Sequence, residues 1–271
     1  MNMNKIHTIY LNIRFIIKQL LGLVKFSDQY IPNRELTFEE DFNSSEIDKS
    51  KWNTSFPWET HSPAKVTEDN LEIKNSIAKF IVKAKSGYID GWWGTSYYKF
   101  TRPHLDTLGK FSQMYGRFEC KAKVKNVKGL FPAFWTLTNE HINNEIGTIK
   151  PEIDVFEHFD NNNGKKQIGC SLHYGITYDK PDSKRTTSYV RWVDFSNKWA
   201  IYSVEWTKES IKWYINNELV KIFYIRDMKH HEIPTHPMFI IINEGVHEDR
   251  LLLNTSKLPE GMEVDWIRIY K

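Results

Sequence analysis

The stretch PEIDVFEH, residues 151–158, is typical of a β-strand with one acidic and one apolar face. In a strand, the side chains at positions i and i+2 point to the same face. We therefore expect Glu152 and Asp154 to lie together, while the intervening Ile153 points into a core. Glu157 has the opposite parity, and it joins the other two acids only if a β-bulge inserts one extra residue after Asp154.

Three acids on one face of a strand repel one another, which favours a chemical role for them. With one residue in the bulge, Glu152 and Glu157 are about four strand steps apart, on the order of 13 Å between Cα atoms. Side chains that lean inward bring the carboxyl groups to roughly 5–6 Å, the separation of a retaining double displacement at a glycosidic bond. One glutamate then attacks the anomeric carbon, the other protonates the leaving oxygen, and Asp154 orients the nucleophile. The alternative is a solvated acidic face on an edge strand.

Short segments of strand-like sequence surround this one. Residues 202–206 and 264–270 alternate between apolar and polar with period two. Hairpin signals occur in residues 66–73 and in residues 210–215, where Asn216 and Asn217 follow.

These short strands predict an all-β fold, a sandwich or jelly roll, and no long amphipathic helix is expected after residue 30. No internal repeat or linker divides the chain, so we expect one catalytic domain over residues 35–271. The polar segments 138–150 and 176–188 are expected to be loops around the site.

The N-terminal segment, residues 1–30, differs from everything after it. Between residues 6 and 24, apolar residues follow helical i, i+3, i+4, i+7 spacing, and basic Arg14 and Lys18 lie off that stripe. This predicts a short basic amphipathic helix, without the roughly 20 uninterrupted apolar residues that span a bilayer. Three interpretations stay open: the helix packs on the domain, it lies on a membrane surface, or it is a secretion leader without a clean signal-peptide cleavage site.

Charge and cysteine content exclude two classes of function. The chain has 37 basic and 34 acidic residues, and the first 26 residues hold four of the basic ones and no acid. The rest is close to neutral, which argues against nucleic-acid binding. Cys120 and Cys170 have no zinc-site spacing, which argues against a structural zinc. Both stand at core positions of strand-like runs, so we expect two buried thiols, with a disulfide between neighbouring strands as the alternative.

Five further segments resemble, in the same order, glycoside hydrolase family 16. They are YGRFECKAK (115–123), GLFPAFWTL (129–137), SLHYG (171–175), VEWT (204–207) and VDWIRIY (264–270). The acid motif resembles the bulged Glu-x-Asp-x-x-Glu form of the laminarinase-like and agarase-like branches, and the resemblance covers about residues 36–271. It implies a concanavalin-like β-jelly roll, with Glu152 as nucleophile, Asp154 as its assisting acid and Glu157 as general acid/base.

The same resemblance implies substrate-binding residues. Trp135 matches a tryptophan that stacks on a sugar, and His173 matches a histidine on the leaving-group side; the alternatives are a core tryptophan and a structural histidine. We also expect Trp93, Arg117 and Asn243 to contact the polysaccharide. Trp93 belongs to an aromatic-rich stretch, residues 88–110, that forms either a sugar-binding wall or loop packing.

The chemistry requires no cofactor, but the resemblance implies a structural calcium at Asp265. One aspartate is a poor signature for an ion that takes 6–8 oxygens, and the alternative is a surface acid in a strand. Lys121 stands where the family usually has arginine, which removes a planar fork that could hold two sugar hydroxyls.

Together these features predict a retaining endo-acting glycoside hydrolase that cleaves internal β-linkages of a β-glucan or galactan. We expect the protein to act as a monomer, secreted or on a membrane surface, with a polysaccharide and no nucleic acid as its partner. Two alternatives stay open: a transglycosylase that uses the same residues, and a non-catalytic carbohydrate-binding module on the same fold.

Overall fold

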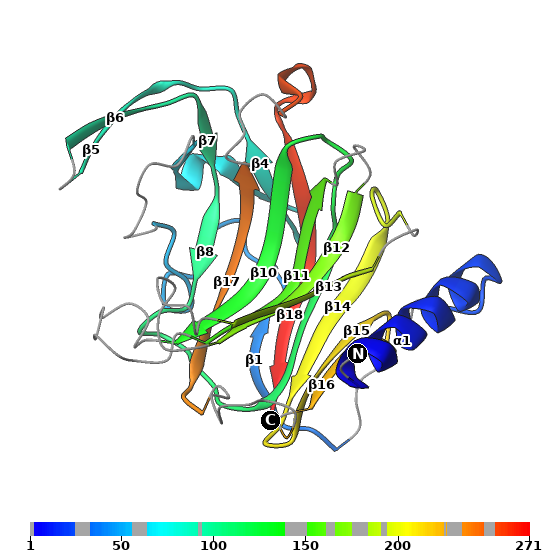
Figure 1. The fold of residues 1–271 in the computed structure, drawn as a ribbon. Coiled ribbons are helices and arrows are strands. Elements are labelled where there is room, and N and C mark those ends of the chain that lie inside the picture. Colours follow the sequence, from blue (N-terminus) through cyan, green and yellow to red (C-terminus); the bar gives the residue numbers. More distant parts are fainter. Residues whose placement is uncertain are drawn as a thin grey trace.

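Two large antiparallel sheets pack face to face in the computed structural model (Figure 1). The structure describes residues 3–24, 33–55, 64–91, 94–138, 151–160, 166–174, 184–190, 194–224, 226, 235–246 and 253–271. Both sheets contribute buried apolar side chains to one shared core. The predicted all-β sandwich is therefore confirmed.

The eight-stranded sheet runs in the order β16-β15-β14-β9-β18-β4-β3, and β1 pairs with β18. Its strands are β1 (Leu36–Glu40), β3 (Leu71–Lys74), β4 (Ile77–Val82), β9 (Gly116–Lys123), β14 (Trp199–Trp206), β15 (Ser210–Ile215), β16 (Glu218–Tyr224) and β18 (Glu260–Tyr270).

The six-stranded sheet runs in the order β13-β12-β11-β10-β17-β8. Its strands are β8 (His104–Asp106), β10 (Leu130–Thr138), β11 (Glu152–Asp160), β12 (Lys166–Tyr174), β13 (Lys184–Val190) and β17 (Met238–Val246). The strand that carries the acid motif, β11, thus has hydrogen-bonded neighbours on both sides and is not an edge strand.

Smaller elements complete the described chain. Strands β2 (Ala64–Val66) and β7 (Phe100–Arg102) form a parallel pair, and β5 (Gly87–Gly91) and β6 (Gly94–Tyr98) form a hairpin that projects from the sandwich (Figure 1). Two short 3₁₀ helices are η1 (Glu68–Asn70) and η3 (Thr255–Lys257).

One predicted hairpin is confirmed and the other is wrong. Asn216 and Asn217, with φ of 50° and 64°, form the two-residue turn between β15 and β16. Residues 66–73 contain no hairpin, because β2 pairs with β7 and the chain then enters η1. The buried Asn70 amide in that turn donates to two backbone carbonyls of other segments, which fixes the local conformation.

Two other expectations change. Residues 184–188, the described part of the loop expected over 176–188, lie in β13 on the edge of the six-stranded sheet, which pairs with β12. Residues 139–150 and 176–183, the rest of the two expected loops apart from Thr138 in β10, lie outside the described residues. The two cysteines are free and buried, as predicted, and the disulfide alternative is wrong because Cys120 belongs to β9 and Cys170 to β12, in different sheets.

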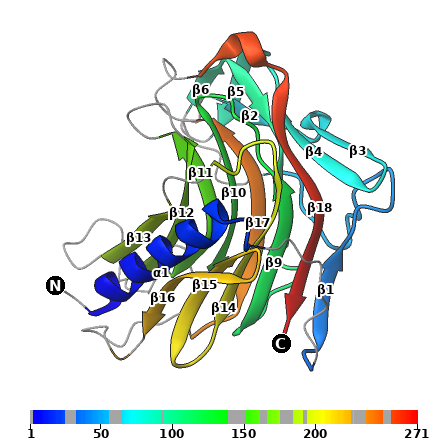
Figure 2. The same cartoon turned by 90° about the vertical axis from the view of Figure 1, so that its right-hand side faces the viewer.

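The predicted N-terminal helix is α1 (Met3–Leu20), and it lies beside β16 (Figure 2). Leu11 and Phe15 are buried, and Phe15 stacks on Phe195 with ring centroids 6.0 Å apart. The Lys18 ammonium lies 2.6 Å from the Glu218 carboxylate of β16. The interpretation that the helix packs on the domain is therefore confirmed. Among the described residues, no helix qualifies as a membrane-spanning segment.

Candidate active site

A bulge in β11 brings the three acids onto one face, as the parity argument requires. Glu152 lies opposite Leu137 of β10, Asp154 opposite Trp135, and Glu157 opposite Ala133. These three partners are two residues apart on a regular strand, so they share a face, and so do the acids. The register shifts between Asp154 and Glu157, where two residues of β11 oppose one residue of β12.

The other face of β11 is apolar and buried. Ile153, Val155 and Phe156 belong to the shared core, and Phe156 lies 4.3 Å from the Tyr202 ring of the eight-stranded sheet. The acids therefore project from the outer face of the six-stranded sheet, away from the core. Glu152 and Glu157 are partly exposed there, whereas Asp154 between them is buried.

His173 of β12 connects two of the acids. Its Nε2 lies 3.2 Å from the Asp154 carboxylate and 3.5 Å from the Glu152 carboxylate. The register explains this contact, because His173 lies directly opposite Glu152. An imidazole in this position can hold both carboxylates in fixed orientations by hydrogen bonding.

Ser171 of β12 serves the third acid. Its hydroxyl donates a 3.1 Å hydrogen bond to the Glu157 carboxylate. No motif in the sequence pointed to Ser171, although its i, i+2 relation to His173 puts both side chains on the same face. The residues opposite Glu157 on either side are Ala133 and Gly169, both small.

Side chains from the core hold the bulge in place. The indole Nε1 of Trp213 (β15) donates to the Asp154 carbonyl at 2.8 Å, and the Cys170 thiol lies 3.8 Å from the Val155 carbonyl. The buried ammonium of Lys221 donates to the Cys170 carbonyl at 2.7 Å and lies 4.3 Å from the centre of the Trp213 ring. The contacts of Trp213 with Asp154 and of Lys221 with Cys170 cross from one sheet to the other and cannot be deduced from local sequence.

The pKa of the Cys170 thiol reflects the charges around the bulge. Burial is the main cause that raises this pKa to about 12. The Lys221 ammonium acts in the opposite direction, and the Asp154 and Glu157 carboxylates reinforce the rise. The acids on the outer face and the lysine in the core are therefore close enough to influence the same sulfur.

Trp135 and Asn243 lie on the acid face, next to the acids. The Trp135 indole Nε1 donates to the Asn243 side-chain oxygen at 2.9 Å. Trp135 is partly exposed and packs against a small apolar cluster on this face, made of Leu137, Phe239 and Ile241. The structure therefore brings Trp135, His173 and Asn243 together with Glu152, Asp154 and Glu157.

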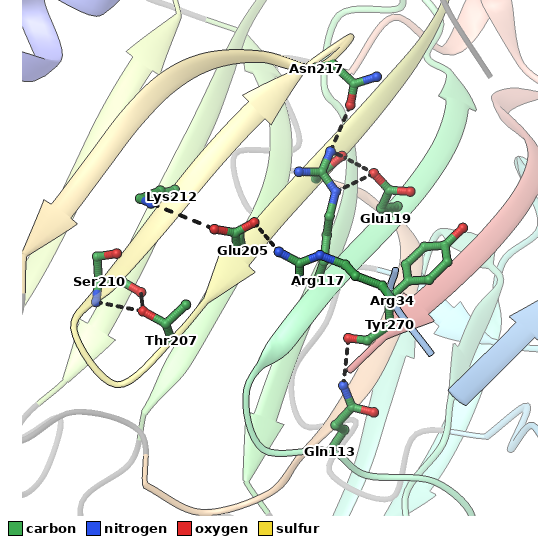
Figure 3. Close-up of polar contacts among 11 residues, drawn as sticks. Arg34, Gln113, Arg117, Glu119, Glu205, Thr207, Ser210, Lys212, Asn217 and Tyr270 are labelled. Atoms are coloured by element: carbon green, nitrogen blue, oxygen red, sulfur yellow. Dashed lines mark hydrogen bonds and ion pairs between the residues drawn. The ribbon is translucent and has the colours of Figure 1, made fainter. Parts of the chain in front are cut away.

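Arg117, expected to bind substrate, lies elsewhere, and that expectation is corrected. It belongs to β9 of the eight-stranded sheet, and its guanidinium pairs with Glu119 at 2.7 Å and Asn217 at 2.9 Å (Figure 3). The guanidinium also stacks on Tyr214, 4.8 Å from the ring centre. These contacts give the buried Arg117 a structural role. Trp93 lies outside the described residues.

Asp265, the expected calcium ligand, has a different partner. Its carboxylate lies 2.7 Å from the Lys121 ammonium, a cation that already neutralises it. Among the described residues, Glu152, Asp154 and His173 offer ligand atoms within 4.8 Å of one another and could hold a metal ion, and Asp265 does not belong to this group. A calcium ion at Asp265 therefore stays a prediction. Lys121 is the ion-pair partner of Asp265.

The chain is similar in sequence to curated glycosidases. The chain is 24% identical over 276 residues to "Glucan endo-1,3-beta-glucosidase A1" of Niallia circulans, covering 90% of this chain and 39% of that protein. It is 25% identical over 259 residues to "Keratan-sulfate endo-1,4-beta-galactosidase" of Sphingobacterium multivorum, covering 88% and 55%. The chain thus spans about two-fifths to just over half the length of these relatives.

The fold is that of a solved laminarinase catalytic domain from Thermotoga maritima. The TM-score is 0.71 at 24% identity, and the match covers 88% of this chain and 98% of that domain. The model of the family "Glycosyl hydrolases family 16" matches residues 50–268, which include all three acids and most of both sheets. The chain therefore belongs to glycosyl hydrolase family 16.

Proposed function

We propose that this protein is an endo-acting glycoside hydrolase that cleaves internal β-linkages of a β-glucan with retention of configuration. One observation carries the proposal: the bulge in β11 presents Glu152, Asp154 and Glu157 together on the outer face of the six-stranded sheet. Retaining glycosidases use two carboxyl groups on either side of the scissile bond, one as nucleophile and one as acid/base.

In the proposed reaction, the Glu152 carboxylate attacks the anomeric carbon while Glu157 gives its proton to the leaving oxygen. This forms a glycosyl ester on Glu152 and releases one half of the chain. Glu157 then takes a proton from water, the water attacks the same carbon, and Glu152 leaves. Asp154 and His173 orient Glu152, and the Ser171 hydroxyl bond orients Glu157. Trp135 supplies a ring for a sugar near this bond.

The names of the similar proteins support the substrate class. The relative from Niallia circulans is a glucan endo-1,3-beta-glucosidase and the similar Thermotoga structure is a laminarinase, so a β-1,3-glucan is the first candidate. The similarity to a keratan-sulfate endo-1,4-beta-galactosidase supports a galactan as the second.

The test measures reducing ends released from soluble β-1,3-glucan, mixed-linkage glucan and β-1,4-galactan. We expect the wild type to act on one of these, with viscosity falling early, as endo cleavage requires. Glu152→Gln should lower the rate about a thousandfold or more, because it removes the nucleophile but keeps its shape. Glu209→Gln, an exposed acid in the turn after β14, is the matched control and should retain full activity.

Two further readouts separate the alternatives. Proton NMR of the first product should show the β-anomer, and an α-anomer would contradict the double displacement. Products longer than the starting oligosaccharide would identify a transglycosylase. Binding to one polymer without release of ends, in wild type and Glu152→Gln alike, would favour a carbohydrate-binding module and overturn the proposal.

A further inference from the structure

The helix α1 has two apolar faces, and only one of them contacts the domain. Leu11 and Phe15 are 3% and 1% exposed and point toward the sandwich, where Phe15 joins the shared core. The ion pair between Lys18 and Glu218 of β16 adds a polar contact at the edge of this face. The helix is therefore held in one orientation on the side of the molecule toward the viewer in Figure 2.

The opposite face of α1 and the turn after it expose large apolar side chains. Eight of the twelve exposed large hydrophobic residues in the described chain lie here: Ile6, Ile9, Tyr10, Ile13, Ile17, Leu20, Leu21 and Leu23, with exposures from 45% to 77%. Contiguous apolar surface of this kind marks an interaction site on soluble domains. We call these eight residues the outer face of α1.

The apolar surface continues beyond the C-terminal end of α1, into the turn that follows Leu20. Gly22 adopts a φ of +67°, and the Leu23 amide donates to the Lys18 carbonyl at 2.8 Å. This six-to-one hydrogen bond is the Schellman motif, which turns the chain back over the last helical turn. This turn gives the exposed Leu21 and Leu23 a defined position directly after the helix.

The charged residues of the N-terminal segment itself are all basic. Arg14 is exposed on α1, and residues 1–27 also contain Lys5, Lys18 and Lys25 but no acid. The Lys18 ammonium is paired with Glu218, so the exposed guanidinium of Arg14 is the group that α1 offers to an anionic surface. A helix with a large apolar face and basic flanks is suited to lie in the plane of a lipid interface, with its charges against anionic headgroups. A second copy of the chain fits less well, because pairing two such faces would bring like charges together.

We propose that the outer face of α1 binds the surface of a bilayer that contains anionic phospholipid. The helix lies flat in the headgroup region with Ile13 and Ile17 toward the acyl chains, while Leu11 and Phe15 keep it attached to the sandwich. The catalytic domain is then held at the membrane surface. This inference does not depend on which polysaccharide is cleaved, nor on whether any is.

The test is flotation of the full chain with vesicles of phosphatidylcholine alone, or of phosphatidylcholine mixed with phosphatidylglycerol. We expect the wild type to float with the mixed vesicles and to bind the neutral ones much more weakly. Ile13→Glu combined with Ile17→Glu should lower the bound fraction at least tenfold, because it places acids in the apolar face. Arg14→Gln should weaken binding about fivefold, the effect of one basic residue near an anionic surface.

Leu36→Glu in β1 is the matched control, since Leu36 is 44% exposed on the sandwich itself, and it should bind like the wild type. Thermal unfolding verifies that each variant is folded. A wild type that ignores both kinds of vesicle, or binds both equally, would overturn the proposal. So would a concentration-dependent dimer that the Ile13→Glu, Ile17→Glu variant abolishes, because the outer face would then be an interface between copies.

Discussion

At the scale of single residues, the site depends on how the bulge in β11 is held. The extra residue, Val155, has no partner on β10. From the core side, the Trp213 indole donates a hydrogen bond to the Asp154 carbonyl. We expect Trp213→Phe to keep the ring but leave that buried carbonyl without its donor. The free energy of unfolding should fall by about 1–3 kcal/mol. The rate constant kcat should fall about tenfold or more with KM nearly unchanged, because Asp154 and Glu157 shift.

Trp206→Phe is the matched control for this experiment. Trp206 is equally buried in the neighbouring strand β14, and within the described chain its Nε1 has no hydrogen-bond acceptor. Its replacement should leave kcat close to the wild-type value. If both variants lose the same activity, then loss of packing is the cause and the hydrogen bond to Asp154 does not position the acids.

The same residues show how much of the site can be predicted from the sequence. Parity within one strand, together with one bulge, predicted that Glu152, Asp154 and Glu157 share a face, because that rule depends only on the backbone. It could not predict Trp213 or Lys221, whose contacts cross from one sheet to the other. The expectation for Arg117 was wrong for a related reason: the motif that contains Arg117 does not show that its strand, β9, belongs to the other sheet.

At the scale of elements, α1 is a helix whose stability comes from one docked stripe. Phe15→Ala should lower the free energy of unfolding of the docked state by about 3 kcal/mol or release the helix, because it empties a core position. Limited proteolysis should then cut within residues 3–24 much sooner than in the wild type. Ile13→Ala, on the outer face, should change stability by less than about 0.5 kcal/mol. Equal protease sensitivity of both variants would contradict the docked position of α1.

The elements also show why local signals mislead. Both hairpin predictions used turn residues, and the Asn216-Asn217 turn was right because the two residues alone supply the positive φ that the turn needs. In residues 66–73, the same kinds of residue serve a 3₁₀ turn, whose Asn70 amide is buried against carbonyls of β4 and β7. Likewise residues 184–188 of β13 were expected in a loop because all five are polar or charged, although they pair with β12.

At the scale of the whole molecule, the reactivity of the two thiols indicates whether the sandwich is folded. Cys120 and Cys170 are 0% and 2% exposed, one in each sheet, and both belong to the shared core. Burial raises the pKa of both thiols, that of Cys170 to about 12. A thiol-specific reagent at pH 8 should therefore label neither cysteine in the native protein and both after unfolding in denaturant, since the thiolate is the reactive form.

The raised pKa also predicts how stability depends on pH. The folded pKa of Cys170 lies above the value of about 9 that it has when unfolded, so the folded state binds this proton more tightly. The contribution of this proton to the free energy of unfolding is fully present below pH 9 and is lost as the pH rises toward 12. The free energy of unfolding should therefore fall between pH 8 and pH 10 in the wild type. In Cys170→Ala, the free energy of unfolding should fall less over the same range. For each protein the change is measured relative to its own free energy of unfolding at pH 8. Equal slopes in denaturant titrations would show that Cys170 does not titrate differently in the two states.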